Sequence, residues 1–371
     1  MLSVAVIGSG IVGSSLAYHL ARGGARVTLI DRAEPGGGTT ARSFAWLNAN
    51  NKTPRAYFDL NLEGMRAHRS LSDEPDLPGI GGYTHWTGNL IWAGRDGEAA
   101  LRQRVERLQH WGYAAAWLDA ATTRATLAPH LTIADPDAPV AHFAGEGWAD
   151  APGLTTCLVD AAVRHGASLR VGTDVVAIDT TGGHLTGITL AGGERIAVDV
   201  VVNAAGAGAA AVSRLAGVPL PMAPTRGLLV RLALAGAPVG PLLHGPDVNI
   251  RPDGLGRVLL HHDGVDTRLG DRDEVSPADP LVRDLVAAAI RVVPALAAAT
   301  TLDARVGVRP ITADGHPRAG PLSALPGYVE ADTHSGVTLG PLLGRLLATE
   351  ILTGDRSPLL ATFHPDRFLR T

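Results

Sequence analysis

The chain has 371 residues, of which 46% are hydrophobic and 18% charged, and its formal net charge is -4. That length fits one large domain or two closely joined ones, with enough apolar residues for a sizeable core. No basic excess favours binding to nucleic acid or an anionic membrane, and the single cysteine, Cys157, excludes an internal disulfide or a cysteine-based metal cluster.

Two expectations about location follow from the same numbers. One thiol is typical of a cytoplasmic protein. The apolar start of the chain lacks the basic residues of a signal peptide, and no other stretch is apolar and long enough to span a bilayer. We therefore expect a cytoplasmic protein without a membrane span and without a metal site.

The first predicted unit is a strand, a glycine turn, a helix and a second strand. Ser3 to Ile7 is apolar, GSGIVG follows at 8–13, and Ser14 to Arg22 has helical periodicity. The second strand, Arg26 to Ile30, ends at Asp31. This is the size and order of a dinucleotide-binding βαβ module.

Each glycine of this turn has a physical reason. Gly8 permits the tight turn, Gly10 lets a pyrophosphate approach the backbone, and Gly13 allows the helix to pack closely on the sheet. Asp31, 18 residues after Gly13, is suited to accept hydrogen bonds from ribose hydroxyls. The alternative is a glycine turn without a ligand, and the motif alone does not separate FAD from NAD. The expected nucleotide contacts are Gly8, Gly10, Ile11, Val12, Gly13, Asp31 and Arg32.

The remaining elements follow in chain order. A loop of small polar residues, GGGTT, occupies 36–40. We expect helices over 99–111, 154–165, 280–299 and about 341–352, and strands over 169–178, 186–202, 225–265 and 327–330.

Six segments together resemble the D-amino-acid oxidase superfamily of FAD-dependent oxidoreductases, and its glycine oxidase and sarcosine oxidase members most closely. They are GSGIVG at 8–13, GGGTTARSFAW at 36–46, the strand and NAAGAG at 200–208, VGVRPITADGHPRAGP at 306–321, THSGVTLGPLLGRLLA at 333–348 and FHPDRF at 363–368. The resemblance implies an α/β fold with a Rossmann-type FAD-binding domain (1–48, 148–216 and 304–371). An antiparallel-sheet substrate domain would take 49–147 and 217–303, with the flavin between the two domains.

The resemblance also implies which residues contact non-covalently bound FAD. Cys157 lies outside the segment where relatives attach the ring. The implied contacts beyond the first turn are Thr39, Thr40, Phe44, Ala45, Trp46, Val175, Ala205, Gly206, Gly336, Val337, Thr338 and Leu339. Ordinary alternatives are a solvated turn at 39–40, core packing at 44, 46 and 175, and a plain helix cap near 338.

The candidates for substrate chemistry rest on the same resemblance. Arg309 matches an arginine that binds the substrate carboxylate, a role suited to a planar guanidinium, although a structural ion pair is the alternative. Arg42 is a second carboxylate candidate, His334 falls where the family places a side chain over the flavin, and Asn249 replaces a tyrosine of glycine oxidases. His261 ends a strand beside His262, and two neighbouring strand residues point to opposite faces.

The implied reaction is oxidation of the C–N bond of a small amine or amino acid, with hydride passing to flavin N5 and the imine then hydrolysed. The electron acceptor is oxygen or another carrier. Sarcosine oxidase-like members use a lysine to activate oxygen, but the only lysine here, Lys52, lies in a different segment. Alternatives are an amino-acid or opine-type dehydrogenase, an NAD(P)-dependent dehydrogenase, a flavin hydroxylase and a non-catalytic FAD-binding subunit. The roles of the tryptophans at 86–117 stay open, with core packing the simplest.

Overall fold

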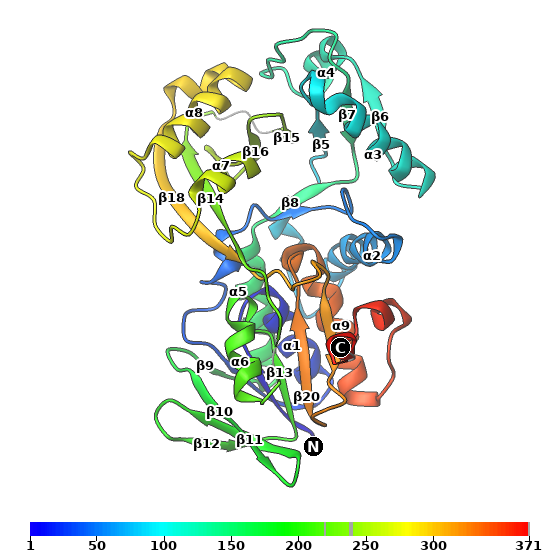
Figure 1. The fold of residues 1–371 in the computed structure, drawn as a ribbon, viewed down its shortest axis with the longest axis vertical. Helices are drawn as coiled ribbons and strands as arrows, with labels where there is room; N and C mark the ends of the chain where they lie inside the picture. The colour runs from blue at the N-terminus through cyan, green and yellow to red at the C-terminus, as the bar shows by residue number, and fades with distance from the viewer. Residues whose placement is uncertain (219, 237–239, 370–371) are drawn as a thin grey trace.

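The computed structural model describes residues 1–218, 220–236 and 240–369. Figure 1 shows a lower lobe that contains both chain ends and an upper lobe joined to it by several chain crossings. The helices are α1 (Ile11–Arg22), α2 (Arg55–Leu71), α3 (Glu98–His110), α4 (Ala120–Thr126), α5 (Ala151–Arg164), α6 (Ala209–Leu215), α7 (Asp263–Leu269), α8 (Pro280–Val292) and α9 (Gly336–Thr353).

The strands are shorter and more numerous than the helices. They are β1 (Ser3–Ile7), β2 (Arg26–Ile30), β3 (Trp46–Leu47), β4 (Thr84–His85), β5 (Asn89–Ile91), β6 (Ala116–Leu118), β7 (Val140–Phe143), β8 (Gly147–Ala149), β9 (Ser168–Arg170), β10 (Val175–Thr181), β11 (His184–Leu190), β12 (Arg195–Ala197), β13 (Val200–Asn203), β14 (Thr225–Ala233), β15 (Leu242–His244), β16 (Asn249–Pro252), β17 (Arg257–His261), β18 (Thr300–Arg309), β19 (Arg318–Pro321) and β20 (Tyr328–Asp332).

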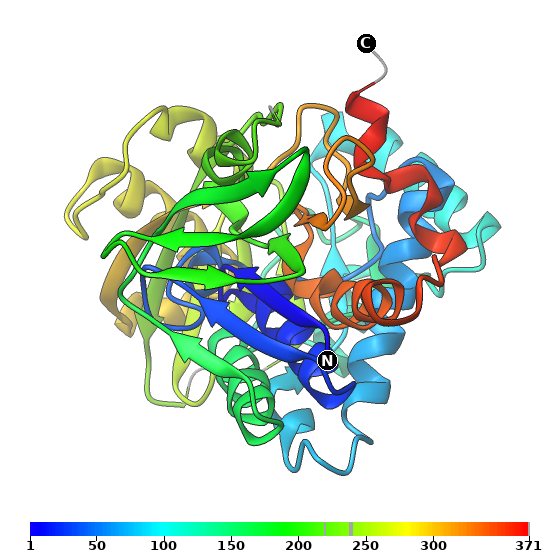
Figure 2. The same cartoon turned by 90° about the horizontal axis from the view of Figure 1, so that it is seen from below.

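A sheet of order β19-β20-β13-β1-β2-β9 forms the centre of the lower lobe, with β1 parallel to β13 and β2. All five residues of β1 are buried, because both faces of the sheet are covered. Val4 and Val6 pack in the cluster formed with α1, α5 and α9, while Ala5 and Ile7 pack against β10–β12 and α6. Figure 2 shows those β10–β12 strands, in green, lying across the central strands.

The upper lobe is built on a second sheet of order β18-β14-β17-β16-β15-β5-β7-β6. Its core includes side chains of β14, β17 and α8. The long pair β14 and β18 runs antiparallel from Thr225 opposite Arg309 to Ala233 opposite Thr300, and descends toward the lower lobe in Figure 1. The expected domain boundary at 303/304 falls inside β18.

The C-terminal helix begins at Gly336, as the family resemblance implied, and five residues before the start at about Pro341 that the sequence pattern indicated. Proline has no N–H, so it cannot donate to the carbonyl of Val337, four residues earlier. His68 of α2 lies with its Nε2 2.7 Å from that carbonyl oxygen and makes the missing hydrogen bond. A side chain from a distant segment therefore lets the helix continue through Pro341.

Other elements also differ from expectation. The strand expected over 169–178 is two strands, β9 and β10, which belong to different sheets and are separated by a turn at Gly172 with φ of 70°. The helix expected over 280–299 ends at Val292, and a 3-10 turn starts at Pro294. In both places a glycine or proline changes the local backbone direction.

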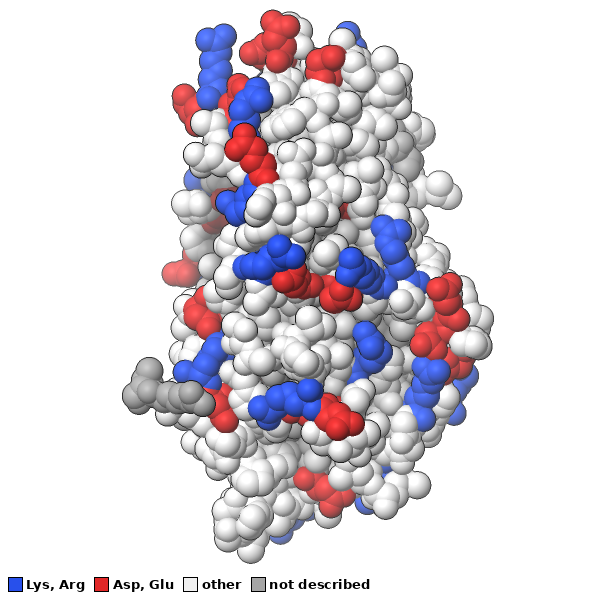
Figure 3. Space-filling view, turned by 90° about the vertical axis from the view of Figure 1, so that its right-hand side faces the viewer, with Lys and Arg blue, Asp and Glu red and all other residues white. Residues whose placement is uncertain are grey.

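Within the described residues, no helix is long and apolar enough to cross a membrane. Figure 3 shows blue and red side chains interspersed on one face, so that neither sign of charge forms a continuous band there.

Candidate active site

A cavity of about 1130 Å³ is lined by residues of both lobes. Its walls include Gly307 and Arg309 of β18, residues 43–52, the start of α9, and part of α3. The expected site residues that line it are Thr39, Arg42, Phe44, Ala45, Trp46, Asn249, His261, Arg309, His334, Val337 and Thr338. The other expected contacts lie outside this lining.

The glycine turn at the end of β1 is closely packed against the turn after β13. Gly8 has φ of 106°, and a Cβ there would lie 2.3 Å from the carbonyl oxygen of Ala204. A Cβ on Gly13 would lie 1.9 Å from the carbonyl oxygen of Gly8. At Gly10, in contrast, a Cβ would meet only Thr40 Oγ1, at 3.2 Å.

The N-cap residue of the following helix, α1, is Gly10, which has no side chain to cap it, and the first turn has no acidic residue. The N–H of Ile11 donates to Thr40 Oγ1 at 3.2 Å. Backbone N–H groups at a helix start can bind an anionic group. The open glycine backbone at Gly10 beside this helix start fits the pyrophosphate of FAD. The segment containing Ala205 and Gly206 adjoins this turn, since a Cβ on Gly8 would also lie 2.9 Å from Ala205 Cα.

Asp31 orders the same turn from the end of β2. One carboxylate oxygen accepts from the backbone N–H and hydroxyl of Ser9, at 2.7 and 2.9 Å, and the other accepts from Ala33 N. The backbone N–H of Thr173 donates to the Asp31 carbonyl, so the chain leading to Val175 runs beside this carboxylate. Arg32 is exposed next to it.

The segment from Phe44 to Trp46 is held from several directions. Arg251 Nε donates to the carbonyl of Phe44 at 2.6 Å, and Thr338 Oγ1 donates to the carbonyl of Trp46 at 3.1 Å. Ala45, between them, has φ of 54°, a left-handed conformation that is uncommon for alanine and found often at functional sites.

Two further contacts join segments that were expected to bind the cofactor. Thr39 Oγ1 donates to the carbonyl of Val308 at 2.8 Å, which joins the GGGTT loop to the strand that carries Arg309. A Cβ on Gly336 would lie 3.9 Å from a methyl group of Ile11, so the starts of α9 and α1 are neighbours. Val337 and Thr338 face the cavity, whereas Leu339 is fully buried in the core.

Arg309 belongs to a network with two of the other substrate candidates. Its guanidinium pairs with Asp266, whose second oxygen accepts from the backbone N–H of Leu228 at 2.8 Å. His261 Nε2 lies 2.9 Å from the Asp266 oxygen that pairs with Arg309, and the Nδ1 atom of His261 lies 3.4 Å from Asn249 Nδ2. The positive neighbours and these hydrogen bonds lower the pKa of Asp266 despite its burial.

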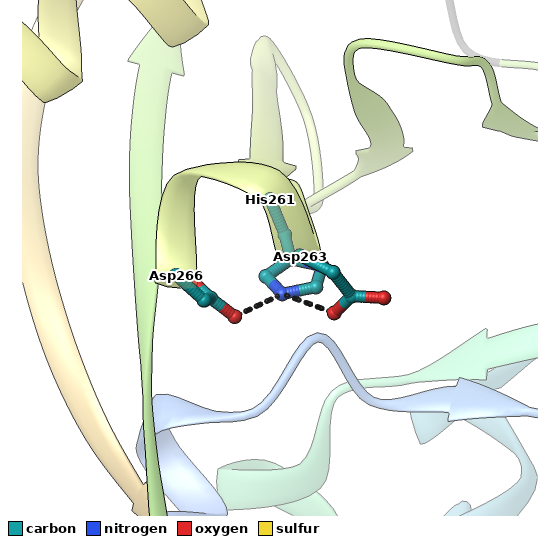
Figure 4. Close-up of side chains that lie close together, drawn as sticks. All are labelled: His261, Asp263 and Asp266. Atoms are coloured by element: carbon teal, nitrogen blue, oxygen red, sulfur yellow. Dashed lines mark hydrogen bonds and ion pairs between the residues drawn. The ribbon is translucent and has the colours of Figure 1, made fainter. Parts of the chain in front are cut away.

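Figure 4 shows His261 between the carboxylates of Asp263 and Asp266. One ligand atom from each of the three lies within 4.8 Å of the others, a spacing that a metal ion could use. However, Nη2 of Arg309 lies 2.8 Å from His261 Nε2 and pairs with Asp266, so a cationic group already occupies the position. The arrangement serves to hold the arginine.

His334 is exposed to the cavity but enclosed by the surrounding protein. This enclosure and the nearby cations Lys52 and Arg309 lower the pKa of His334 to about 4, so its imidazole is neutral at pH 7. A neutral ring can accept or donate a hydrogen bond without adding charge.

Sequence reasoning missed two ionisable groups, Lys52 beside His334 and Glu146 near Lys52. Lys52 lines the cavity, although its segment had suggested no role there, and burial lowers its pKa to about 8. Glu146 is fully buried and accepts hydrogen bonds of 2.8 Å from Trp46 Nε1, Asn89 Nδ2 and Tyr113 OH. Burial raises the pKa of Glu146 to about 7. No local motif marks either residue.

Arg42 lines the cavity but is tied to its own loop, since Nη1 donates to the carbonyl of Gly37 at 2.7 Å. Trp92 is buried and also lines the cavity, while Trp111 and Trp117 pack against the core cluster of α3. The guanidinium of Arg69 lies over the ring of Trp86, with its Cζ atom 3.8 Å from the ring centre.

Comparisons with known proteins agree with this architecture. The model of a family described as FAD dependent oxidoreductase (DAO) matches residues 3–350. The chain is 28% identical to glycine oxidase of Geobacillus kaustophilus, over 99% of this chain and 97% of that one, and the solved structure of that enzyme superimposes with a TM-score of 0.86 over 99% of both chains.

Two other relatives cover the whole chain. Hydrogen cyanide synthase subunit HcnC of Pseudomonas aeruginosa is 27% identical, over 98% of this chain and 96% of that protein. The solved iminodiacetate oxidase IdaA of Chelativorans sp. is 26% identical, covers 98% of both chains and has a TM-score of 0.83.

Proposed function

The chain belongs to the DAO family of FAD-dependent oxidoreductases, and from that premise we propose that it oxidises the C–N bond of a small amino acid. FAD is the cofactor of this family. We further propose that residues 1–48, 148–216 and 304–371 bind FAD, and that 49–147 and 217–303 form most of the substrate site.

One observation carries this proposal. Arg309 lies in the wall of the same cavity as Phe44 to Trp46, Val337 and Thr338, the residues that would hold the flavin ring. A carboxylate bound by Arg309 would therefore lie beside the reactive part of the cofactor. A ligand cavity between two lobes is also where small-molecule sites commonly occur.

The protein groups divide the work as follows. Arg309, oriented by Asp266 and His261, binds the substrate carboxylate and fixes the position of the neighbouring carbon. The neutral imidazole of His334 hydrogen-bonds the substrate amine. When bound, FAD supplies the acceptor for the hydride that leaves the carbon next to nitrogen. The amine loses its proton, and water then converts the resulting imine to an oxo acid and ammonia or an amine.

The names of the relatives support a substrate that carries both nitrogen and carboxylate. Glycine oxidase and iminodiacetate oxidase each name such a compound. Asn249 of this chain, beside His261, stands where glycine oxidase-like members have a tyrosine, which argues for a substrate other than glycine. Oxygen and a separate electron carrier are both compatible with the cavity.

The test is an anaerobic visible spectrum of the purified protein, titrated in turn with amines and with D- and L-amino acids. We expect a flavin spectrum that an amino acid bleaches, and prompt return of the colour in air if oxygen is the acceptor. Slow return in air, with rapid return on adding an artificial quinone, would identify a dehydrogenase. A yellow protein that no compound bleaches would contradict the proposed oxidation.

A further inference from the structure

Among the described residues, five cations of the cavity wall have no anionic partner, but Arg42 is hydrogen-bonded to the carbonyl of Gly37 and Arg95 is exposed. The other three are enclosed and have neither kind of compensation. Lys52, Arg104 and Arg107 all line the cavity, and none forms an ion pair or a side-chain hydrogen bond with the described part of the protein. Uncompensated cations in an enclosed space are costly, because burial removes water from their charges. Such a cost is often retained for binding an anion.

The two arginines lie on one face of α3. They are three residues apart, so their side chains are neighbours on the helix surface. Both are half-buried, and the Nε atom of each is fully buried without a hydrogen-bond partner. Arg102 on the same helix differs, because it is exposed and pairs with Glu98. The unpaired arginines are therefore those that line the cavity.

The surrounding charges do not neutralise this group. Burial, together with Arg107, lowers the pKa of Arg104 despite nearby Glu146. Both oxygens of Glu146 are occupied by neutral donors, and it forms no ion pair with Lys52 or Arg104. The carboxylates in the lining are Asp96 and Asp263, and both residues are exposed.

Arg309 provides the contrast within the same cavity. Asp266 balances its charge from behind and holds its guanidinium, so Arg309 can be enclosed at little net cost even without a ligand. The phosphates of FAD do not account for Arg104 and Arg107, since the turn that fits them lies at the start of α1 in the lower lobe, whereas α3 belongs to the upper lobe (Figure 1).

We propose that Lys52, Arg104 and Arg107 bind a second carboxylate of the substrate, distal to the one held by Arg309. The substrate class is then a dicarboxylic amino or imino acid. This inference rests on the proposed function for the first carboxylate and the amine, and adds the feature that separates the substrate from neutral amino acids.

Binding of non-oxidisable acids to the FAD-loaded protein tests the subsite directly. Glutarate and acetate would be titrated while the fluorescence of the cavity tryptophans and the flavin spectrum are recorded, because Trp46 and Trp92 line the cavity. We expect tighter binding of glutarate, and a rise of about tenfold in its Kd for Arg104→Gln, for Arg107→Gln and for Lys52→Gln. The Kd for acetate should change less than about twofold, and Arg102→Gln should change neither.

Thermal unfolding of the same variants separates binding from a structural role. Arg104→Gln and Arg107→Gln remove unpaired charges, so we expect them to be at least as stable as the natural protein while binding glutarate more weakly. Equal affinity for glutarate and acetate, or destabilised variants with unchanged affinity for glutarate, would overturn the inference.

Anaerobic bleaching with matched compounds completes the test. Glutamate and iminodiacetate should reduce the flavin with a lower KM than norvaline and sarcosine, and Arg104→Gln should raise only the KM of the dicarboxylic compounds. Faster reduction by the neutral compounds, unaffected by these variants, would sink the inference but leave the proposed function intact. No reduction by any compound would contradict the proposed function, and the glutarate titration would still decide the subsite.

Discussion

The two lobes present different kinds of chemical groups to the expected ligands. The lower lobe offers backbone groups: the glycines at 8, 10 and 13 and the start of α1, with one carboxylate, Asp31, that orders the turn. The upper lobe offers charged side chains: Arg104 and Arg107 of α3, and Asp266 and His261 behind Arg309.

This difference predicts which kind of substitution disrupts each site. A backbone site depends on space, so a single added methyl group can destroy it. A side-chain site depends on charge balance, so removal of one partner leaves another charge uncompensated. Substitutions in the two lobes should therefore fail for different reasons.

The largest effect is expected for Gly13→Ala in the lower lobe. The new methyl group would lie 1.9 Å from the carbonyl oxygen of Gly8, and backbone at that distance must move. We expect a loss of about 3 kcal/mol or more in the free energy of unfolding, together with loss of bound FAD. Gly145→Ala is the matched control, because a Cβ there meets nothing within 4 Å. Denaturant unfolding and the ratio of flavin to protein absorbance measure both, and a Gly13→Ala variant that binds FAD normally would contradict the packing argument.

A smaller loss is expected for Asp266→Asn in the upper lobe. Asp266 is nearly buried, and its loss of charge leaves Arg309 and His261 without their shared anion. We expect the free energy of unfolding to fall by about 2–3 kcal/mol. Asp284→Asn, which removes an exposed partner of Arg268, should cost less than about 1 kcal/mol. Similar losses for the two variants in urea unfolding would argue against a special role for the buried pair.

The lower lobe also holds a buried acid whose effect depends on pH. Burial raises the pKa of Asp332 to about 8, and neither of its oxygens has a hydrogen-bond partner among the described residues. Since the folded pKa lies above the unfolded value of about 3.9, the stabilising contribution of its bound proton is full below pH 4 and is lost as pH rises to 8.

Asp332→Asn should therefore flatten this part of the stability profile. Between pH 6 and pH 8 the natural protein should lose about 2 kcal/mol relative to the variant. Asp160→Asn, at an exposed position on α5, is the control and should leave the profile unchanged. Parallel profiles for the natural protein and Asp332→Asn would show that the acid does not titrate in this range.

The smallest effect is expected at Ala45, where the segment between the lobes has its left-handed residue. Ala45→Gly relieves a strain of about 1 kcal/mol but makes the unfolded chain more flexible by a similar amount. We expect a net change below about 0.5 kcal/mol. Ala149→Gly, at a buried position in β8, should cost about 1 kcal/mol or more. A cost at Ala45 equal to that at Ala149 would indicate that its φ of 54° carries no strain.

The contrast between the lobes also explains what could be predicted from the sequence. The nucleotide site of the lower lobe could be predicted because it depends on glycines at fixed spacing within one short segment. The α/β fold and the FAD family followed from such segments. The local pattern alone placed the start of α9 too late, at about Pro341, because the hydrogen bond that this proline cannot make is supplied by His68, from a helix far away in sequence.

The charged groups of the upper lobe were harder to predict because the residues that contact one another come from distant segments. Arg309 was predicted to bind substrate, but Asp266, 43 residues earlier, carries no local pattern that links the two. Glu146 is held by donors from three separate segments, and Lys52 was set aside because of its position in the chain. Local sequence cannot show which charges will share a cavity.

The most direct test of the central claim is the rate of anaerobic flavin reduction in the natural protein and in Arg309→Met, for an amino acid and for the matching amine without the carboxylate. The account predicts that the natural protein prefers the amino acid by about a hundredfold or more in kcat/KM, and that Arg309→Met loses most of that preference while keeping its FAD. An unchanged preference in Arg309→Met would contradict the claim that this cavity binds an amino acid through Arg309.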